Sequence, residues 1–374
     1  QLILLAKEDW HSIETSWGFK TSPWLDTNFD GTNNELEVQY QTLENKIRDF
    51  IKRVSELETG VNEYVILSYK LEEVFSADIL NSELAYHNNP YYLKPLETGQ
   101  LNEEYEQDIW GAYRANKVQA LISYGIGCVL GRYRVGKTSV TYAGLAGQEF
   151  NEIYDFENAP YKPDEDGIVP LTDIAWFKDD AAECFRDWLK VTFGADMLDK
   201  NMQFLSESLL TLLPNSPGEK SPFEILRHYL VAKFYKHHVD IYQKKPIYWL
   251  FSSGKQKAFE CLVYLHRYNE GTLSRMRTEY VTPLLGKYEA YVEQMQKQLD
   301  DAISTSEAKQ YEKELVILLK KQTELGEFDD KLKHYADMQI QLNLDDGVKV
   351  NYGKFGDLLA DVKAISGKNV SALK

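Results

Sequence analysis

A phosphate-loop pattern stands out among the residues of this sequence that could do chemistry. Residues Gly131 to Thr138 satisfy the pattern at every position. Such a loop holds phosphates only where a buried strand precedes it and a helix follows it. Here a helical run precedes the pattern, and the sequence after it is strand-like and broken by glycine. We therefore interpret it as a basic loop, in which Arg132, Arg134 and Lys137 contact a DNA backbone, and keep nucleotide binding at Lys137 as a minor alternative.

A longer basic stretch, residues 233–277, is the best candidate for recognition of DNA. Its cations are interleaved with aromatic residues. The cations beside the strand turn Ser252-Ser253-Gly254 could hold phosphates while a neighbouring side chain reads base edges. The alternative is that these cations are only the solvated ends of strands and helices. The candidate DNA contacts in this stretch are Lys244, Lys245, Ser252, Ser253, Lys255, Lys257, Arg267, Arg275 and Arg277.

A second match is to the calcium loop. Asp26, Asn28, Asp30 and Glu37 reproduce the ligand spacing of that loop. However, Pro23 interrupts the helix that should enter it, and a turn that caps the following helix explains the same residues. Whether these four residues bind a cation stays open, and we predict no metal site.

Two other motifs favour structural roles. Residues Asn88 to Tyr91 resemble the Asn-Pro-Pro-Tyr element that grips a flipped adenine in amino-methyltransferases, but one proline position does not match, so we expect a solvated loop. No glycine-rich turn of the kind that binds S-adenosylmethionine lies upstream of it. His237 and His238 are adjacent, so their side chains diverge on a helix, and we expect a polar helix face.

The composition limits how the protein could meet DNA. The net charge is −16, and duplex DNA is itself densely negative, so any contact must use a local basic patch. The sequence is rich in aromatic residues, with 25 Tyr, 16 Phe and 7 Trp, which suit both cores and recognition surfaces. The sequence therefore favours recognition of DNA by a local patch over attraction of DNA by the electrostatic field of the whole protein.

The cysteines and the apolar runs indicate a cytoplasmic protein. Cys128, Cys184 and Cys261 lie far apart inside apolar runs, as expected of small buried residues and not of a disulfide or zinc set. No stretch approaches the roughly 18 apolar residues that a membrane span needs. The start is too short and acidic for a signal peptide, and the absence of Met at position 1 suggests a position inside a longer chain.

The periodicity predicts an α+β fold that is mostly helical. We expect helices over 35–75, with a boundary at Gly60, and over 103–129, 173–192 and 223–242. Residues 247–251 and 259–265 predict a strand pair, and 158–170 a loop. Two long helices, 274–303 and 307–338, predict an antiparallel hairpin with Thr305 or Ser306 as N-cap. The second helix repeats apolar residues every seven positions, as a coiled-coil seam does.

These elements predict four consecutive parts. Residues 1–125 form a helical connector or docking region, and residues 126–270 form a globular mixed α/β target-recognition domain. Residues 271–340 form the long antiparallel helical hairpin, a coiled-coil-like spacer, and residues 341–374 form a C-terminal segment. At 374 residues the chain is long enough for at least two cores.

Short sequence motifs in several segments of the chain resemble those of one protein family. The chain resembles the C-terminal region of the PglX family, the adenine-specific DNA methyltransferases of BREX phage-defence systems. The motifs that carry the resemblance are Ala6 to Trp10, Glu14 to Trp17, Gly127-Cys128, Gly131 to Tyr133, Tyr154 to Pro160, Asp164 to Gly167, Pro246 to Lys255, Leu265 to Tyr268, and Leu344 to Tyr352.

The resemblance implies a role in recognition and not in catalysis. The parent enzyme would transfer a methyl group from S-adenosylmethionine to adenine N6, and the family's cofactor-binding and catalytic motifs lie upstream, so no residue here inherits those roles and no cofactor is expected in this region. The implied partners are double-stranded DNA, the upstream methyltransferase domain and other BREX proteins, without a membrane. The alternative is a protein-interaction scaffold that docks other subunits of the defence system.

Overall fold

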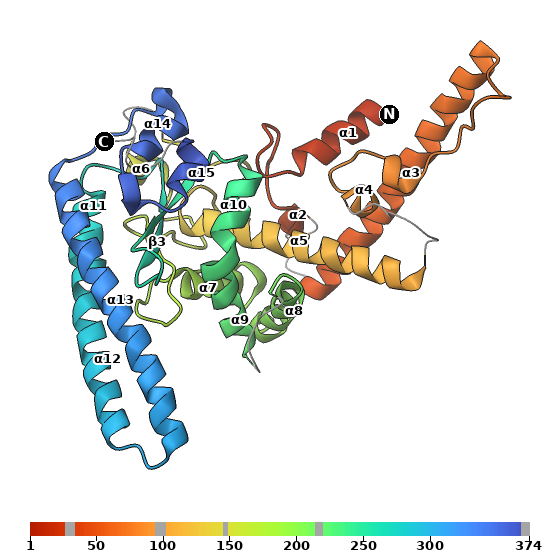
Figure 1. Ribbon diagram of the computed structural model, residues 1–374. Helices are drawn as coiled ribbons and strands as arrows, with labels where there is room; N and C mark the ends of the chain where they lie inside the picture. Colours follow the sequence, from red (N-terminus) through yellow and green to blue (C-terminus); the bar gives the residue numbers. More distant parts are fainter. Residues whose placement is uncertain (27–33, 94–101, 145–148, 214–219, 368–374) are drawn as a thin grey trace. The chain divides into compact units, whose positions relative to one another are not determined.

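The chain folds into two compact units. The computed structural model describes residues 1–26, 34–93, 102–144, 149–213 and 220–367 (Figure 1). Each unit is built from segments that are separated in sequence. Unit 1 comprises Gln1–Gly127, Tyr133–Thr141 and Asp187–Tyr229, and unit 2 comprises Cys128–Arg132, Tyr142–Arg186 and Leu230–Lys374.

Unit 1 is helical. Its elements are α1 (Leu2–His11), α2 (Pro23–Asp26), α3 (Leu36–Tyr69), the 3-10 helix Asn81–Glu83, α4 (Pro90–Leu93), most of α5 (Glu103–Val129), the second half of α7 (Ala181–Phe193), α8 (Leu198–Leu210) and α9 (Pro222–Tyr229). Aromatic side chains fill its core, where Trp24, Tyr40 and Phe204 pack against one another. Asn201 fixes the start of α3, because its Oδ1 accepts a hydrogen bond of 2.8 Å from the Leu36 amide.

The two helices expected early in the sequence have different outcomes. The helix predicted over 103–129 is confirmed as α5, whose first turn carries three acidic residues that favour a helix N-terminus. The boundary predicted at Gly60 is wrong, because α3 continues through it to Tyr69. A glycine inside a helix costs only about 1 kcal/mol, which the rest of a 34-residue helix outweighs.

Unit 2 joins a small sheet to a helical hairpin. Its helices are α6 (Phe150–Ile153), the start of α7, the π-helix Leu230–Phe234, α10 (Tyr235–Ile241), α11 (Thr272–Arg275), the π-helix Met276–Val281, α12 (Thr282–Asp300), α13 (Thr305–Asp337), α14 (Gly347–Gly353) and α15 (Val362–Ser366). Two 3-10 helices, Leu344–Asp346 and Gly356–Leu358, lie beside α14 in sequence. The predicted α+β, mostly helical class is confirmed.

The sheet has three antiparallel strands in the order β1-β3-β2. They are β1 (Ile168–Pro170), β2 (Tyr248–Ser252) and β3 (Glu260–Tyr264), and every residue in them is buried. The predicted strand pair is confirmed as β2 and β3, with Trp249 opposite Val263. The loop predicted over 158–170 is wrong at its end, because β1 pairs Ile168 with Val263 on the other edge of β3.

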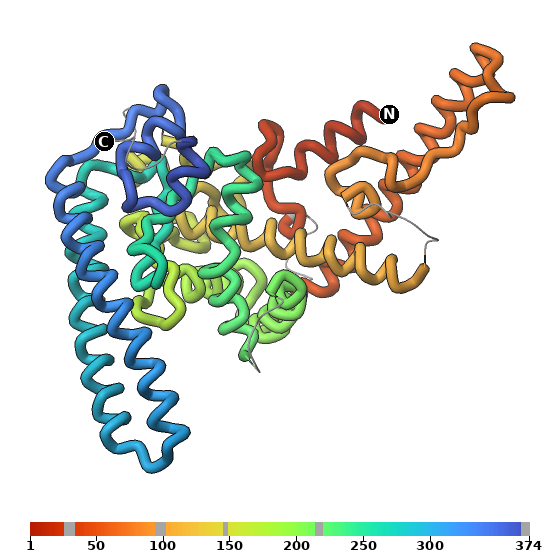
Figure 2. The backbone as a smooth tube through the Cα atoms, in the orientation of Figure 1, coloured from red at the N-terminus to blue at the C-terminus, as the bar shows by residue number. Residues whose placement is uncertain are grey.

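The long hairpin is formed by α12 and α13, which lie side by side (Figures 1 and 2). The predicted N-cap is wrong by one or two residues. Ser304 caps α13, since its Oγ accepts a hydrogen bond of 3.2 Å from the Glu307 amide and the Glu307 carboxylate accepts one from the Ser304 amide. Of the heptad residues, Leu318, Leu325 and Leu332 are buried, whereas Tyr311 is half-buried.

Helix α7 begins later than predicted. The sequence predicts a helix from residue 173, but α7 starts at Ala181, where the Asp180 carboxylate accepts hydrogen bonds of 3.0 Å from the Ala182 and Glu183 amides. Asp180 is therefore the residue that ends the preceding turns and starts the helix. Helix α8 was not predicted at all.

Candidate nucleic-acid interface

The β2–β3 hairpin places seven of the predicted DNA contacts of unit 2 at its two ends. Lys244 and Lys245 precede β2, and Arg267 follows β3, so these three residues lie at one end of the antiparallel pair. Ser252 and Lys255 belong to the other end, together with the rest of the β2–β3 turn. A five-residue strand separates the ends by about 17 Å. The structure therefore brings these seven candidates together in two groups and not in one.

The turn at the far end of β2 already holds an anion. The Glu324 carboxylate of α13 accepts hydrogen bonds from the Ser253 hydroxyl (2.8 Å), the Gln256 amide (2.7 Å) and the Ala258 amide (3.4 Å). Gly254 lies so close that a Cβ there would be 3.0 Å from the Glu324 Oε2 atom, and its φ is +136°. The hydroxyl and amide donors of the turn therefore bind a carboxylate of the same unit.

The other polar residues of this turn also have internal partners. The Ser252 hydroxyl donates a hydrogen bond of 2.9 Å to the Glu260 carboxylate. Lys257 donates to the Val231 carbonyl oxygen (3.0 Å) and pairs with Glu260 (3.1 Å). Lys255 is exposed. At this end, Lys255 is therefore the candidate whose ammonium group is most available to an external phosphate.

Arg267, at the opposite end, belongs to a buried network. Its guanidinium group donates to the Glu165 carbonyl oxygen (2.8 Å) and lies over the Phe150 ring, 4.0 Å from the centroid. Burial lowers the pKa of Arg267, and the nearby Asp164 and Asp166 carboxylates oppose that shift. Two donors of Arg267 are bound to the Leu130 and Glu165 carbonyl oxygens, so this side chain holds segment 164–167 against the end of β3.

Asp164, beside Asp166, makes the same network sensitive to pH. Burial raises the pKa of Asp164 to about 8, with a further contribution from the neighbouring Asp166 carboxylate, while Arg267 lowers it. The Asp164 carboxylate accepts a hydrogen bond of 2.6 Å from the Gly167 amide. The Tyr280 hydroxyl bridges Asp166 (3.0 Å) and Asp179 (2.8 Å). An acidic cluster is thus balanced internally by one arginine.

The three cations of the phosphate-loop pattern fall in both units. Arg132, in unit 2, is half-buried, and its Nη1 atom lies 3.4 Å from the Tyr264 hydroxyl at the end of β3. Arg134 and Lys137 belong to unit 1, where Arg134 is half-buried and Lys137 is exposed. Helix α5 precedes the pattern, and the described residues up to Gly144 contain no helix after it. This segment therefore lacks the strand-loop-helix arrangement on which phosphate loops depend.

Arg275 and Arg277 lie at the start of the long hairpin. Arg275 is exposed and sits 3.5 Å from Glu279. Arg277 forms a two-pronged ion pair with Asp329 of α13, with both nitrogen-to-oxygen distances at 2.9 Å. Hydrogen bonding to Asp329 raises the pKa of Arg277. The Arg277 charge is therefore matched by a carboxylate that joins the two helices.

Exposed lysines occur throughout residues 233–257, the part of the chain that contains α10 and β2. Residues 233–257 contain six lysines against one acidic residue, Asp240, and all six lysines are exposed. The helical segment and β2 lie alongside each other. Lys257 reaches the Val231 carbonyl oxygen at one end, and the His238 imidazole accepts hydrogen bonds from the Ile247 and Tyr248 amides at the other. The basic residues thus follow one helix-strand pair, which we call the lysine segment (residues 233–257).

The aromatic residues interleaved with these lysines belong mainly to the core. Tyr248 and Trp249 are buried, and the Trp249 ring packs against Tyr352 and Phe355. A base cannot stack on a ring that is already enclosed by other side chains. The lysine segment therefore offers charge at its surface, while its aromatic residues stabilise the fold.

Two predictions of polar surface are wrong. His238 is buried, its pKa is held well below the ordinary value by burial, and its neutral Nε2 atom accepts from two backbone amides. The segment Asn88 to Tyr91 is also buried and not a solvated loop. Asn89 donates to the carbonyl oxygens of Asn81 (2.7 Å) and Leu84 (2.8 Å), which fixes the turn before α4. Both motifs are therefore structural.

The calcium-loop pattern lies partly outside the described residues, because Asn28 and Asp30 fall in the gap 27–33. Within the described ranges, no group of three or more His, Cys, Asp or Glu side chains is arranged to hold a metal ion. The three cysteines form no disulfide, and Cys128 and Cys261 are buried. In the part of the chain that the structure covers, no helix combines the length and apolar character needed to cross a membrane.

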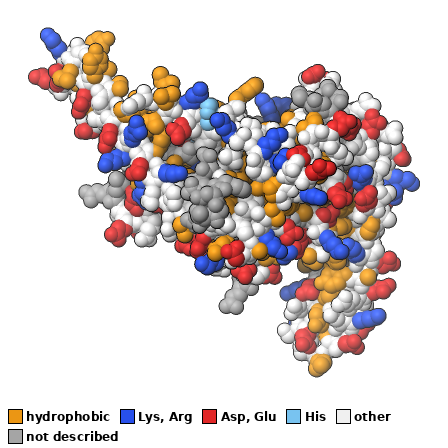
Figure 3. All heavy atoms as spheres, turned by 180° about the vertical axis from the view of Figure 1, so that it is seen from behind, with side chains coloured by type: hydrophobic (Ala, Val, Ile, Leu, Met, Phe, Trp, Pro, Cys, Tyr) orange, Lys and Arg blue, Asp and Glu red, His pale blue; other side chains and the backbone are white. Residues whose placement is uncertain are grey.

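The charged side chains are interspersed on the face shown in Figure 3. Lysine and arginine side chains alternate there with aspartate and glutamate side chains over both units. In the same way, Lys244 lines a depression of unit 2 together with the acidic residues Asp357 and Asp361. Any DNA contact would have to use a short basic segment between acidic neighbours.

The chain is similar to two adenine-specific methyltransferases over nearly its whole length. It is 40% identical to the adenine-specific methyltransferase BrxX of Escherichia coli strain HS over 99% of this chain. It is 33% identical to the adenine-specific methyltransferase PglX of Lacticaseibacillus casei strain Zhang over 94% of this chain. The chain spans only 30% and 27% of these relatives' own lengths. No protein-family model matches the sequence.

Proposed function

We propose that this chain is the part of a BREX adenine-specific methyltransferase that recognises DNA. It is homologous to one region of these enzymes, as its sequence motifs predict. The methyl donor, S-adenosylmethionine, and the catalytic residues would belong to a separate, upstream methyltransferase domain. The observation that carries the proposal is the lysine segment, with six exposed lysines against one acid in a chain of net charge −16.

The proposed contacts are the lysines whose charges the fold leaves at the surface. Lys244 and Lys245 precede β2, Lys255 follows it, and all three are exposed. Ammonium groups of this kind bind phosphates and position a protein on the duplex, whereas base edges are read by other side chains. Arg267 and Arg277 are instead engaged within unit 2, by segment 164–167 and by Asp329 respectively.

The proposal predicts a change in the salt dependence of DNA binding. Replacing Lys244 and Lys245 with glutamine should weaken binding to duplex DNA uniformly across sequences. The slope of log K against log salt concentration should fall by about 0.9 for each phosphate contact removed. Fluorescence anisotropy across a salt series measures the slope.

A matched control removes the same charge elsewhere. Lys309 and Lys313 are exposed on α13, at the far end of the hairpin from the sheet. The Lys309→Gln, Lys313→Gln variant changes the net charge equally and should leave the slope unchanged. Equal slopes for the wild-type protein and the Lys244→Gln, Lys245→Gln variant would argue against the lysine segment as the DNA contact.

A second candidate function, docking of another protein part, is favoured by an exposed apolar surface in unit 1. The C-terminal part of α3, residues 61–69, has no buried residue, and Val74 and Phe75 in the segment after it are also exposed. We define the α3 patch as Val61, Tyr64, Val65, Leu67, Tyr69, Val74 and Phe75, which are 43–74% exposed. Contiguous exposed apolar side chains often mark interaction sites in soluble proteins.

The occupant that we propose for the α3 patch is the part of the methyltransferase that lies outside the matched region of the relatives. A Leu67→Ser, Tyr69→Ser variant should lose capture of that part of the Escherichia coli relative in a pull-down. The Val316→Ser, Ile317→Ser variant on α13, where both residues are 51% exposed, should retain it. Equal capture by both variants would exclude the α3 patch as the docking surface.

A further inference from the structure

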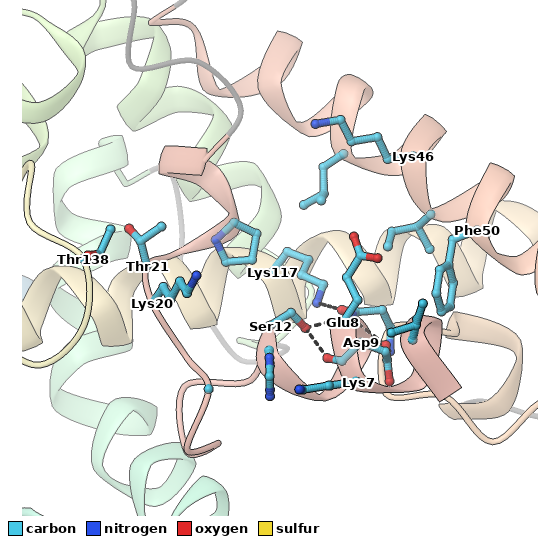
Figure 4. Close-up of a pocket in the computed structure, with 17 residues that line it drawn as sticks. Lys7, Glu8, Asp9, Ser12, Lys20, Thr21, Lys46, Phe50, Lys117 and Thr138 are labelled. Atoms are coloured by element: carbon cyan, nitrogen blue, oxygen red, sulfur yellow. Dashed lines mark hydrogen bonds between the residues drawn. The ribbon is translucent and has the colours of Figure 1, made fainter. Parts of the chain in front are cut away.

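A cavity in unit 1 gathers lysines from four segments of the chain. Its volume is about 580 Å³, which lies within the range of small-molecule sites. Lys7 comes from α1, Lys20 from the loop before α2, Lys46 from α3 and Lys117 from α5, and Figure 4 shows them around the opening. The sequence alone did not single out any of these lysines.

Lys117 is the buried member of this set. Its side chain is 7% exposed, yet it occupies a helix face whose neighbours, Tyr113 and Val118, are core residues. The ammonium group donates a hydrogen bond to the Asn88 Oδ1 atom and lies over the Tyr113 ring. An ammonium group has three donors, so the hydrogen bond to Asn88 uses one of them.

The acid nearest to Lys117 is committed to other donors. The Asp9 carboxylate accepts hydrogen bonds from the His87 amide (2.7 Å), the Asn88 amide (2.9 Å) and the Asn88 side-chain amide (2.8 Å). The Asn88 side-chain amide also donates to the Ser12 hydroxyl (2.8 Å). Asp9 and Asn88 therefore hold the base of the cavity in place, and four lysines face two acids, Glu8 and Asp9, around it.

The remaining walls are apolar or carry hydroxyl groups. Leu43, Ile47 and Phe50 form one side on α3, and Phe50 is half-buried. Thr21 and Thr138 line the opposite side, so the last residue of the phosphate-loop pattern contributes a hydroxyl although the pattern has no phosphate-loop fold. A basic floor beside a flat apolar wall matches a ligand with an anionic group and a planar apolar body.

We propose that this cavity binds the phosphate group of a nucleotide, with Lys117, Lys20 and Lys46 around the phosphate and the base against Leu43, Ile47 and Phe50. The nucleotide can be free in solution or the phosphorylated end of a DNA strand, because both carry the same monoester. The inference concerns binding alone and does not rest on the proposed recognition of DNA by unit 2.

The first experiment compares ligands that differ in one feature. AMP, adenosine and a 5′-phosphorylated oligonucleotide are titrated into the whole chain by calorimetry at pH 7.5 and low salt. Binding of AMP with much weaker binding of adenosine supports the proposal, and binding of the oligonucleotide without AMP assigns the phosphate to a DNA end. Equal binding of AMP and adenosine, or no binding of either phosphorylated probe at millimolar concentration, overturns it.

The second experiment tests the lysines. Lys20 and Lys46 are exposed at the rim, so the Lys20→Gln, Lys46→Gln variant should fold and should bind the phosphorylated probe about tenfold more weakly for each lost contact. The Lys309→Gln, Lys313→Gln variant, with the same charge change on α13, should bind as the wild-type protein does. Equal affinity in the two variants contradicts the assignment.

The pH dependence of the same titration distinguishes the contribution of Lys117 from that of Lys20 and Lys46 at the rim. Burial lowers the pKa of Lys117 to about 8, and the Asp9 charge partly opposes this shift. The charged groups around it are Asp9, Glu8 and Lys7 on α1, Lys46 on α3 and Lys20 on the loop, while burial lowers the pKa of the neighbouring His87. Affinity should fall as pH rises from 7 to 9, and the fall should be absent in Lys117→Met. An identical pH profile in Lys117→Met would contradict a role for this ammonium group.

Discussion

Replacing Arg267 with alanine is expected to lower the free energy of unfolding of unit 2 by about 3 kcal/mol. The change removes a positive charge near the Asp164 and Asp166 carboxylates, together with the contact on the Phe150 ring. It also leaves the Leu130 and Glu165 carbonyl oxygens without the donors that Arg267 supplies. The melting temperature should fall by roughly 6 to 12 °C.

The matched control for this variant is Arg275→Ala. Arg275 lies eight residues along the chain, but its side chain is 49% exposed and its partner Glu279 is 59% exposed. A solvent-exposed pair at 3.5 Å contributes little, so the melting temperature should change by no more than about 2 °C. Equal destabilisation by the two substitutions would contradict the internal role that the structure gives to Arg267.

The loss in Arg267→Ala should also depend on pH. The folded-state pKa of Asp164 is raised to about 8, above its value in the unfolded chain, so the protonated carboxyl is the form that the fold prefers. Its stabilising contribution is therefore present at low pH and is lost as pH rises towards 8. Without Arg267 the ionised carboxylate is worse accommodated, so the variant should lose more stability at pH 8 than at pH 6. Thermal melts at the two pH values measure this difference.

Because Arg267 stabilises the fold, a loss of DNA binding in a variant that lacks it does not by itself identify a DNA contact. A Lys255→Ala, Arg267→Ala double variant tests recognition only if the folded state survives, and the contacts of Arg267 predict that it is weakened. Lys244, Lys245 and Lys255 are exposed, so their substitution probes surface charge without disturbing that network.

Long periodic elements could be predicted from the sequence because their signal is repeated many times. The helix over 103–129 is found as α5, and the apolar residues that define it are buried at Trp110, Tyr113 and Leu121. The hairpin and the β2–β3 pair are found for the same reason. The strand β1 was missed because three residues beside Pro, Asp and Gly carry no periodic pattern, and its pairing with β3 is decided by residues almost a hundred positions away.

The polar residues were harder to interpret because their partners are distant in sequence. His238 was expected at a polar surface, but the amides of Ile247 and Tyr248 complete its hydrogen bonding and allow it to be buried. Lys117 could have been noticed as a cation in the middle of an apolar helix face, between Tyr113 and Val118. Its neighbour Asn88, however, is set only by the folded chain. The units themselves are assembled from separated segments, which a division into consecutive parts cannot represent.

The turn at Ser252 and Ser253, expected beside a DNA phosphate, is occupied in this structure by a side chain of the same unit. Its hydroxyl and amide groups do bind an anion, but the anion is Glu324, about seventy residues further along the chain. The contact ties the hairpin helix α13 to the sheet, because three donors of the β2–β3 turn converge on one carboxylate. Hydrogen bonds to a charged acceptor are about twice as strong as neutral ones.

Glu324→Ala is therefore expected to lower the free energy of unfolding of unit 2 by about 2 kcal/mol, since the Ser253 hydroxyl and the Gln256 and Ala258 amides lose their acceptor. Hydrogen exchange at the Gln256 and Ala258 amides should become faster. Glu327→Ala, an exposed acid on the same helix, should change neither quantity. Unaltered exchange in Glu324→Ala would mean that the turn does not depend on this carboxylate.

The Glu324→Gln variant separates the structural role of the turn from phosphate binding. Glutamine keeps the length of the side chain but removes its charge, so an incoming phosphate would no longer be repelled from the turn. If Lys244 and Lys245 provide the contacts, affinity for duplex DNA should stay within about twofold of the wild-type value, because they lie at the other end of β2, about 17 Å away. A tenfold gain in affinity would instead identify the turn as a phosphate site that Glu324 occupies in the absence of DNA.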